Sequence, residues 1–153
     1  THCQNYLKIL LLRHPDNFEY YVEIQEEVTD ALIFPFLIQV FVENAAKHAL
    51  TLSERTLISV TVYPEDREDE KYVNIYISDT GRGFPQDILQ GLQRGEDISK
   101  GGEHVGIENC MKRFYYYYQD KGEIHFENSP LGGAIVDIHI AYEKGENYES
   151  FAG

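Results

Sequence analysis

The stretch PFLIQVFVENAAKH at residues 35–48 predicts the first helix of the fold. Its proline falls near the first turn, where a missing N–H does no harm, and we expect the helix to cover residues 36–50. Residues four apart share a row on such a helix, which gives one row of Phe36, Val40, Asn44 and His48 and another of Leu37, Phe41 and Ala45. Asn44 interrupts an otherwise apolar face. Because an unpaired buried amide costs a few kcal/mol, Asn44 needs either a backbone partner or a ligand.

Glu43 and Lys47 stand within one turn of Asn44 on the predicted helix. Together the three side chains offer a carboxylate, an amide carbonyl and an ammonium group. Hydrated Mg²⁺ prefers hard oxygen ligands, and a polyphosphate requires a nearby cation, so this turn suits a complex of the two. The alternative is an ordinary surface pair between Glu43 and Lys47, and the helix pattern alone favours neither.

Asp79 is a second polar group at the end of an apolar row. Residues 72–79 alternate like a half-buried strand, and Asp79 follows its inward-facing apolar residues. The next residues, TGRGFP at 80–85, turn the chain, and Gly81 and Gly83 allow a flat ligand to approach the backbone closely. An ionised carboxylate only accepts hydrogen bonds, so Asp79 suits the exocyclic amine of adenine. The alternative is an aspartate that caps the turn.

The sequence GGEHVGIEN at residues 101–109 leads from glycines into a helix that we expect over residues 107–118. The start of a helix offers free N–H groups and the positive end of its dipole, which together suit phosphate. Glycine before a helix is common, so this stretch alone is a weak indication.

The remaining patterns complete the fold class. They predict strands over residues 18–25 and 56–63, a short helix over 86–91, and two last strands near Ile124 and Val136 joined by the turn SPLGG. The charged run at 64–70 is expected to be a hairpin tip. Strands with one apolar face need a helical cover, so we predict an α/β (α+β) two-layer sandwich, in which a mixed, mostly antiparallel sheet of about five strands is covered on one face by three helices.

The composition limits the class of protein. With 42% apolar residues among 153, the chain is long and apolar enough for one globular domain. Its 26 acidic residues outnumber 13 basic ones, a net charge of −13, which argues against nucleic acid and anionic membranes as general partners. Cys3 and Cys110 form no CxxC motif and are expected to be free thiols. The sequence contains no run of about 18 apolar residues, so it predicts no membrane span.

Taken together and in this order, the three motifs resemble a known family. ENAAKH on a helix, DTGRG after a strand and GGEHVGIEN before a helix resemble the N, G1 and G2 boxes of the GHKL ATPase superfamily. The lead-in PFLIQVFVENA, with Asn109 and MKRF at 111–114, is similar to the LytS/YesM-type sensor histidine kinases. The resemblance covers about residues 18–140 and implies a Bergerat-type ATP-binding fold with ATP and Mg²⁺ as its cofactors.

The resemblance implies a role for each residue of the ENAAKH motif. Asn44 would bind Mg²⁺, and Glu43 would occupy the position of an acidic residue proposed as a general base toward the attacking nucleophile. Lys47 would contact the phosphates. His48 would lie beside the ribose or the phosphates.

The glycine motifs would hold the rest of the nucleotide. Asp79 would accept from the adenine amine, while Gly81 and Gly83 would admit the ring. The phosphates would lie under a lid over residues 92–105, against Gly102, Val105, Gly106 and Ile107. Two departures stand out: Ala134 follows Gly133 where the family usually has a threonine whose hydroxyl supports the aspartate, and His104 stands where many kinases have glycine. We expect weaker adenine binding and a stiffer lid.

The resemblance also implies a division of the chain and a set of partners. Residues 1–13 would end a helix of an upstream dimerisation region, residues 14–145 would form the ATP-binding catalytic domain, and residues 146–153 would be a tail. The chain would be a piece of a cytoplasmic domain from a homodimeric bacterial plasma-membrane sensor kinase. Its partners would be its own dimerisation domain, which carries the phosphoacceptor histidine, and a response regulator. The alternatives are another GHKL ATPase and a pseudokinase that only senses nucleotide.

Overall fold

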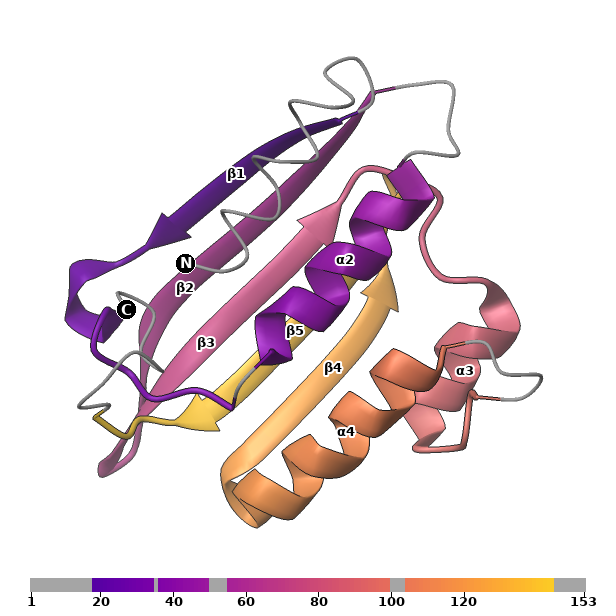
Figure 1. The fold of residues 1–153 in the computed structure, drawn as a ribbon. Helices are drawn as coiled ribbons and strands as arrows, with labels where there is room; N and C mark the ends of the chain where they lie inside the picture. Colours follow the sequence, from indigo (N-terminus) through magenta and orange to yellow (C-terminus); the bar gives the residue numbers. More distant parts are fainter. Residues whose placement is uncertain (1–17, 35, 50–54, 100–103, 145–153) are drawn as a thin grey trace.

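One sheet of five strands forms the framework of the computed structural model, which describes residues 18–34, 36–49, 55–99 and 104–144. The strands are β1 (Phe18–Ile24), β2 (Thr56–Arg67), β3 (Glu70–Asp79), β4 (Gly122–Asn128) and β5 (Ala134–Ala141). They lie in the order β1-β2-β3-β5-β4, as Figure 1 shows. Only β1 and β2 pair in parallel, and the other three pairs are antiparallel. The prediction of a mixed, mostly antiparallel sheet is therefore confirmed.

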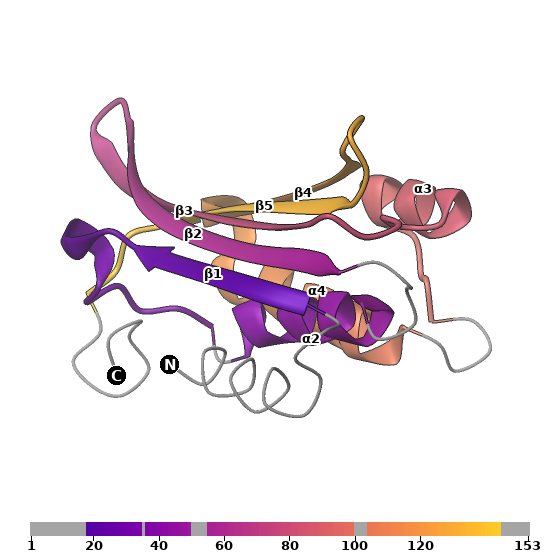
Figure 2. The same cartoon turned by 90° about the horizontal axis from the view of Figure 1, so that it is seen from above.

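Two helices cover one face of this sheet, and a third lies at its end. The long helices α2 (Leu37–Ala49) and α4 (Val105–Tyr118) lie on the same side, whereas α3 (Gln86–Arg94) lies beyond the sheet, next to β4 (Figure 2). Gln93 of α3 donates to the carbonyl of Phe126 on β4 at 3.0 Å. The two-layer sandwich is confirmed, with α3 closing an end of the core. No helix in the described part of the chain is long and apolar enough to cross a bilayer.

The core lies between the sheet and the two long helices. Alternate strand residues face it, so that Val136, Ile138 and Ile140 of β5 are buried while the residues between them are half-buried. The helices contribute Leu37 and Phe114, both fully buried. This alternation is the pattern from which the strands were predicted, because apolar burial is the main driving force for packing a sheet against helices.

The predicted hairpin tip at residues 64–70 is mostly strand, because β2 and β3 continue to a short turn at Glu68 and Asp69. The charge of this segment made it look like a loop. β1 pairs with β2 only as far as Val62, and beyond it no strand among the described residues pairs with that edge of β2, which is where prolines such as Pro64 are tolerated in strands. The guanidinium of Arg67 lies 4.4 Å from the centre of the Tyr72 ring, which supports the extended hairpin.

The buried face of α2 also differs from the prediction. Phe36 precedes the helix, has a positive φ of 65° and is 64% exposed. The buried rows are those that contain Leu37 and Ile38, whereas Val40 and Asn44 are half-buried. Asn44 therefore lies on the flank of the apolar face. At this position a polar group meets both protein and solvent.

We expect the substitution Tyr118→Phe to destabilise the fold by about 1–2 kcal/mol. Tyr118 is buried at the end of α4, and its hydroxyl accepts the N–H of Phe34 at 2.8 Å. Burial raises the pKa of this hydroxyl, and its removal leaves the Phe34 N–H unpaired. Urea unfolding measures the loss, and Tyr116→Phe is the control because Tyr116 is 85% exposed. Equal stability of the two variants would show that the buried hydrogen bond contributes nothing.

Candidate nucleotide-binding site

The second half of α2 carries the first group of predicted site residues. Glu43 is half-buried, and its Oε1 accepts a hydrogen bond from Gln39 Nε2 at 2.7 Å. Lys47 is exposed, and the ion pairs formed by the described residues do not include one between Glu43 and Lys47. The alternative of an ordinary surface pair is therefore not seen among the described residues. His48 belongs to α2, but its side chain lies outside the described part of the structure.

Asn44 is the polar side chain of this helix that most needs explanation. It is half-buried, and within the described residues its amide makes no hydrogen bond to a backbone group or a side chain. The alternative of a local backbone partner is thus not seen. The amide carbonyl is therefore a candidate oxygen ligand, and its role toward Mg²⁺ stays a prediction.

Asp79, the last residue of β3, is half-buried and holds the turn that follows it. Its Oδ1 accepts the N–H of Gly81 at 2.8 Å and that of Ala134 at 3.4 Å. Asp79 is therefore a turn cap, as the alternative interpretation expected. A carboxylate has about four acceptor positions, so capping and adenine recognition are compatible, and the role toward adenine stays a prediction. The backbone of Ala134 supports Asp79 even though its side chain has no hydroxyl.

The glycines near Asp79 have packing roles that the motif did not indicate. Gly83 has a φ of +79°, and a Cβ there would lie 2.6 Å from Asn128 Oδ1. Gly133 has a φ of +98°, and a Cβ there would overlap the backbone carbonyl oxygen of Asp79. The turn between β4 and β5 thus packs directly on the loop after β3. Sequence reasoning missed Asn128, whose carboxamide bonds Phe84, because no local pattern connects residues 44 positions apart.

The start of α4 supplies the third element of the site. His104 precedes the helix with a φ of 58° and makes no side-chain cap hydrogen bond to the first turn. A Cβ on Gly106 would lie 3.9 Å from Val40 Cγ2, so α4 begins beside α2. Val40 lies one helical turn before Asn44, in the same row of α2. Val105 and Gly106 are exposed, whereas Ile107 is buried in the core and can offer a ligand only its backbone. Gly102 lies outside the described residues.

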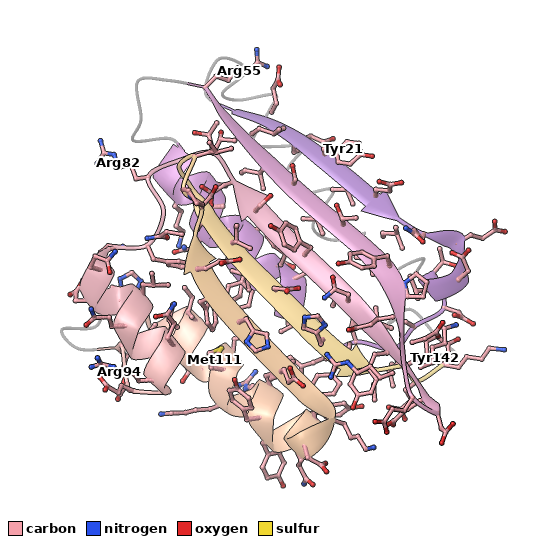
Figure 3. The ribbon with its side chains drawn as sticks, turned by 180° about the vertical axis from the view of Figure 1, so that it is seen from behind. Tyr21, Arg55, Arg82, Arg94, Met111 and Tyr142 are labelled. Carbon is pink, nitrogen blue, oxygen red and sulfur yellow. The ribbon has the colours of Figure 1, made fainter. Side chains whose placement is uncertain are left out.

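Figure 1 shows how these parts are arranged. The C-terminal ends of α2 and β3 and the turn between β4 and β5 lie at the same end of the molecule. Arg82, in the loop after β3, projects outward at this end (Figure 3). Carboxylate and amide oxygens on α2 fit Mg²⁺, and the uncapped N–H groups of α4 fit phosphate. The residues present are therefore compatible with a magnesium nucleotide.

Two histidines and one cysteine outside these motifs have roles in the structure of the domain. On β4, His125 is exposed between the buried Ile124 and Phe126, so it lies on the face of the sheet opposite the helices, and it pairs with Glu123 at 3.1 Å. On the same face, His139 Nδ1 lies 2.7 Å from Glu65 Oε2. Burial raises the pKa of the free Cys110 thiol to about 11, which makes it unreactive. Both histidines thus lie on strands, away from the motifs. His2, His14 and Cys3 lie outside the described residues.

The fold and these motifs define a nucleotide-binding domain of the GHKL type. Residues 29–144 match the model of the histidine kinase-, DNA gyrase B-, and HSP90-like ATPase family. This match extends over most of the chain, and the chain belongs to that family. ATP binding is the property that the members share by description.

Sequence relatives of the chain include sensor histidine kinases. The chain is 30% identical over 142 residues to the sensor histidine kinase/phosphatase LytS of Staphylococcus aureus. The aligned region covers 92% of this chain and 24% of the relative. The chain is 32% identical to the sensor protein LytS of Staphylococcus haemolyticus over 88% of this chain and 22% of the relative. The chain thus spans about a quarter of the length of these relatives.

Solved structures show the same fold at low sequence identity. The catalytic domain of histidine kinase ThkA superposes with a TM-score of 0.61 at 17% identity, over 92% of each chain. The mycobacterial sensor histidine kinase MprB gives a TM-score of 0.56 at 16% identity, over 93% of each chain. Full-length ShkA in complex with AMPPNP gives 0.61 at 14% identity, over 94% of this chain and 30% of ShkA.

Proposed function

We propose that this chain binds Mg-ATP within a sensor histidine kinase and presents it for phosphoryl transfer to a histidine outside the described residues. The observation that carries this proposal is the half-buried Asn44 amide, which makes no hydrogen bond within the described residues. It stands in the ENAAKH motif of a chain whose family is defined by ATP binding. A ligand that supplies a partner for this amide explains why an asparagine occupies the position.

The predicted residues on α2 and the start of α4 each have a part in this proposal. Asn44 would hold Mg²⁺, which supplies charge neutralisation at the phosphates and keeps several of its waters. Gln39 holds the Glu43 carboxylate in place, where it suits a general base toward the accepting histidine. Lys47 and His48, together with the start of α4, would contact the phosphates and ribose. The chemistry of this domain is positioning and electrostatic stabilisation, with no covalent intermediate on the chain itself.

The partners follow from the same class of protein. The accepting histidine would lie on the dimerisation domain of a homodimeric parent, and the phosphoryl group would pass from there to an aspartate of a response regulator. The parent would be a bacterial plasma-membrane sensor with this domain in the cytoplasm. These proposals are supported by the sensor kinases among the sequence relatives. The same relatives disfavour an ATPase of the gyrase or chaperone kind.

Autophosphorylation of the full-length parent with labelled ATP is the direct test. We expect incorporation of label that requires Mg²⁺, because the Glu43–Asn44 pair is intact. If this chain binds Mg-ATP but the parent incorporates no label, the domain is a nucleotide-sensing pseudokinase. If the chain does not bind Mg-ATP at all, the proposed function is wrong.

The substitution Asp79→Asn is expected to weaken ATP binding about 10- to 100-fold while changing stability little. Asparagine keeps an acceptor oxygen for the Gly81 and Ala134 N–H groups but loses the negative charge and one acceptor. The turn cap therefore survives, whereas a charge-assisted bond to the adenine amine does not. Calorimetric titration with Mg-ATP measures the affinity, and urea unfolding measures the stability.

Asp87→Asn is the matched control, because Asp87 is exposed in the first turn of α3. Its ATP affinity should equal that of the unmodified chain. If Asp79→Asn lost stability and affinity in equal measure, Asp79 would be a turn cap without a role toward adenine.

A further inference from the structure

Asn128, the last residue of β4, makes two hydrogen bonds to one residue of the loop after β3. Its Oδ1 accepts the N–H of Phe84 at 2.8 Å, and its Nδ2 donates to the carbonyl of Phe84 at 2.9 Å. A single carboxamide thereby pairs both backbone groups of Phe84, as a neighbouring strand would. These two bonds tie the loop to the sheet across 44 residues of sequence.

The loop is shaped to receive this carboxamide. A Cβ on Gly83 would lie 2.6 Å from Asn128 Oδ1 and 2.9 Å from its Cγ, so the Asn128 side chain occupies the space that any other residue at position 83 would need. The φ of Gly83, +79°, is one that residues with a side chain rarely adopt. Gly83 is therefore required by Asn128 as well as by any approaching ligand.

The Phe84 side chain anchors the same point of the loop in the core. It is 6% exposed, and its ring meets Phe126 of β4 edge-on at 6.0 Å between centroids. Phe126 in turn lies 5.9 Å from Phe41 of α2. Phe41 precedes Glu43 and Asn44 by less than one turn, so the aromatic contacts connect the loop to the helix that carries the predicted Mg²⁺ ligand.

The two strand ends that flank the β4–β5 turn hold the loop at both ends. At the start, Asp79 Oδ1 receives the Ala134 N–H, and at the far end Phe84 is paired by Asn128. We infer that Asn128 is a positioning residue for the nucleotide, because its carboxamide fixes the loop 80–84 in a binding-competent form before ATP arrives. This inference rests on the proposed function. A preformed loop costs less ordering on binding, so Asn128 acts on affinity and not on the transfer step.

The substitution Asn128→Ala is expected to weaken Mg-ATP binding to this chain about tenfold, because the loop then has to be ordered on binding. In the full-length parent, KM for ATP should rise by the same factor while kcat stays within about twofold. Calorimetry and initial-rate autophosphorylation measure the two effects. Hydrogen exchange provides a readout without nucleotide, since the Phe84 amide should exchange faster in the variant.

Ser129→Ala is the matched control, because the Ser129 hydroxyl accepts the Leu131 N–H within the turn and bonds nothing in the loop. Its ATP affinity should not change. If Asn128→Ala does not fold, Asn128→Asp keeps the acceptor for the Phe84 N–H, loses the donor to its carbonyl and should show the same rise in KM. Unchanged affinity in a folded Asn128 variant, or a fall in kcat at constant KM, would overturn the inference while leaving the proposed function intact. Failure of the unmodified chain to bind Mg-ATP would overturn both.

Discussion

Replacing Asn44 by alanine should lower autophosphorylation of the full-length parent by at least about 100-fold. Mutating a residue that only hydrogen-bonds to a metal ligand already costs up to about 100-fold, and the loss of the ligand itself should cost no less. The Asn44 amide carbonyl is the oxygen that we assign to Mg²⁺. Without it Mg²⁺ would lose the ligand that Asn44 would supply, and the phosphates would be less well oriented and neutralised. Labelled ATP measures the transfer. Titration of this chain with ATP, with and without Mg²⁺, measures binding.

The stability of the same variant separates a ligand role from a structural one. Asn44 makes no hydrogen bond within the described residues, and alanine favours a helix more than asparagine does. Asn44→Ala should therefore be as stable as the unmodified chain or more stable by about 0.5 kcal/mol. Gln90→Ala, an exposed amide on α3, is the control for activity and should keep it. Unchanged Mg-ATP affinity together with normal autophosphorylation would show that Asn44 is not the metal ligand.

The parts of the fold that follow from local periodicity were predictable from sequence. Alternation located β1 and β3, and spacing by four described α2. The charged run at 64–70 misled because charge alone does not distinguish an exposed strand from a loop. The sequence does not say that β1 stops pairing at Val62. The length of the β2–β3 hairpin was therefore underestimated.

Some residues of the candidate site could likewise be predicted from the local sequence, and others could not. Asn44 and Asp79 stand out locally, because each is a polar group next to an apolar row. Asn128 shows no such signal, since an asparagine at a strand end before a turn is ordinary and its partner Phe84 is 44 residues away. Likewise, the φ of Gly133 follows from the turn, but the close approach of its backbone to Asp79 depends on how β5 is placed beside β3. Contacts between distant segments require the assembled sheet.

Gly133→Ala is expected to destabilise the fold by about 3–5 kcal/mol, the sum of backbone strain and overlap. Its φ of +98° disfavours any residue with a side chain, and a Cβ would overlap the carbonyl oxygen of Asp79. That oxygen belongs to backbone at the end of β3, so relief requires the turn or the strand end to move. Urea unfolding measures the loss of stability. Because the displaced residue is Asp79, Mg-ATP binding should weaken as well.

Gly132→Ala separates overlap from strain. Gly132 has a similar φ of +104°, but the nearest atom to its Cβ would be the Gly81 carbonyl oxygen at an ordinary 3.7 Å. This variant carries the backbone cost alone, about 1–3 kcal/mol, and should retain ATP binding. The difference in stability loss between the two variants then measures the cost of the overlap between the β4–β5 turn and the backbone of Asp79. Equal stability losses would mean that the turn moves aside freely, and the close approach of Gly133 would then have no part in holding the aspartate.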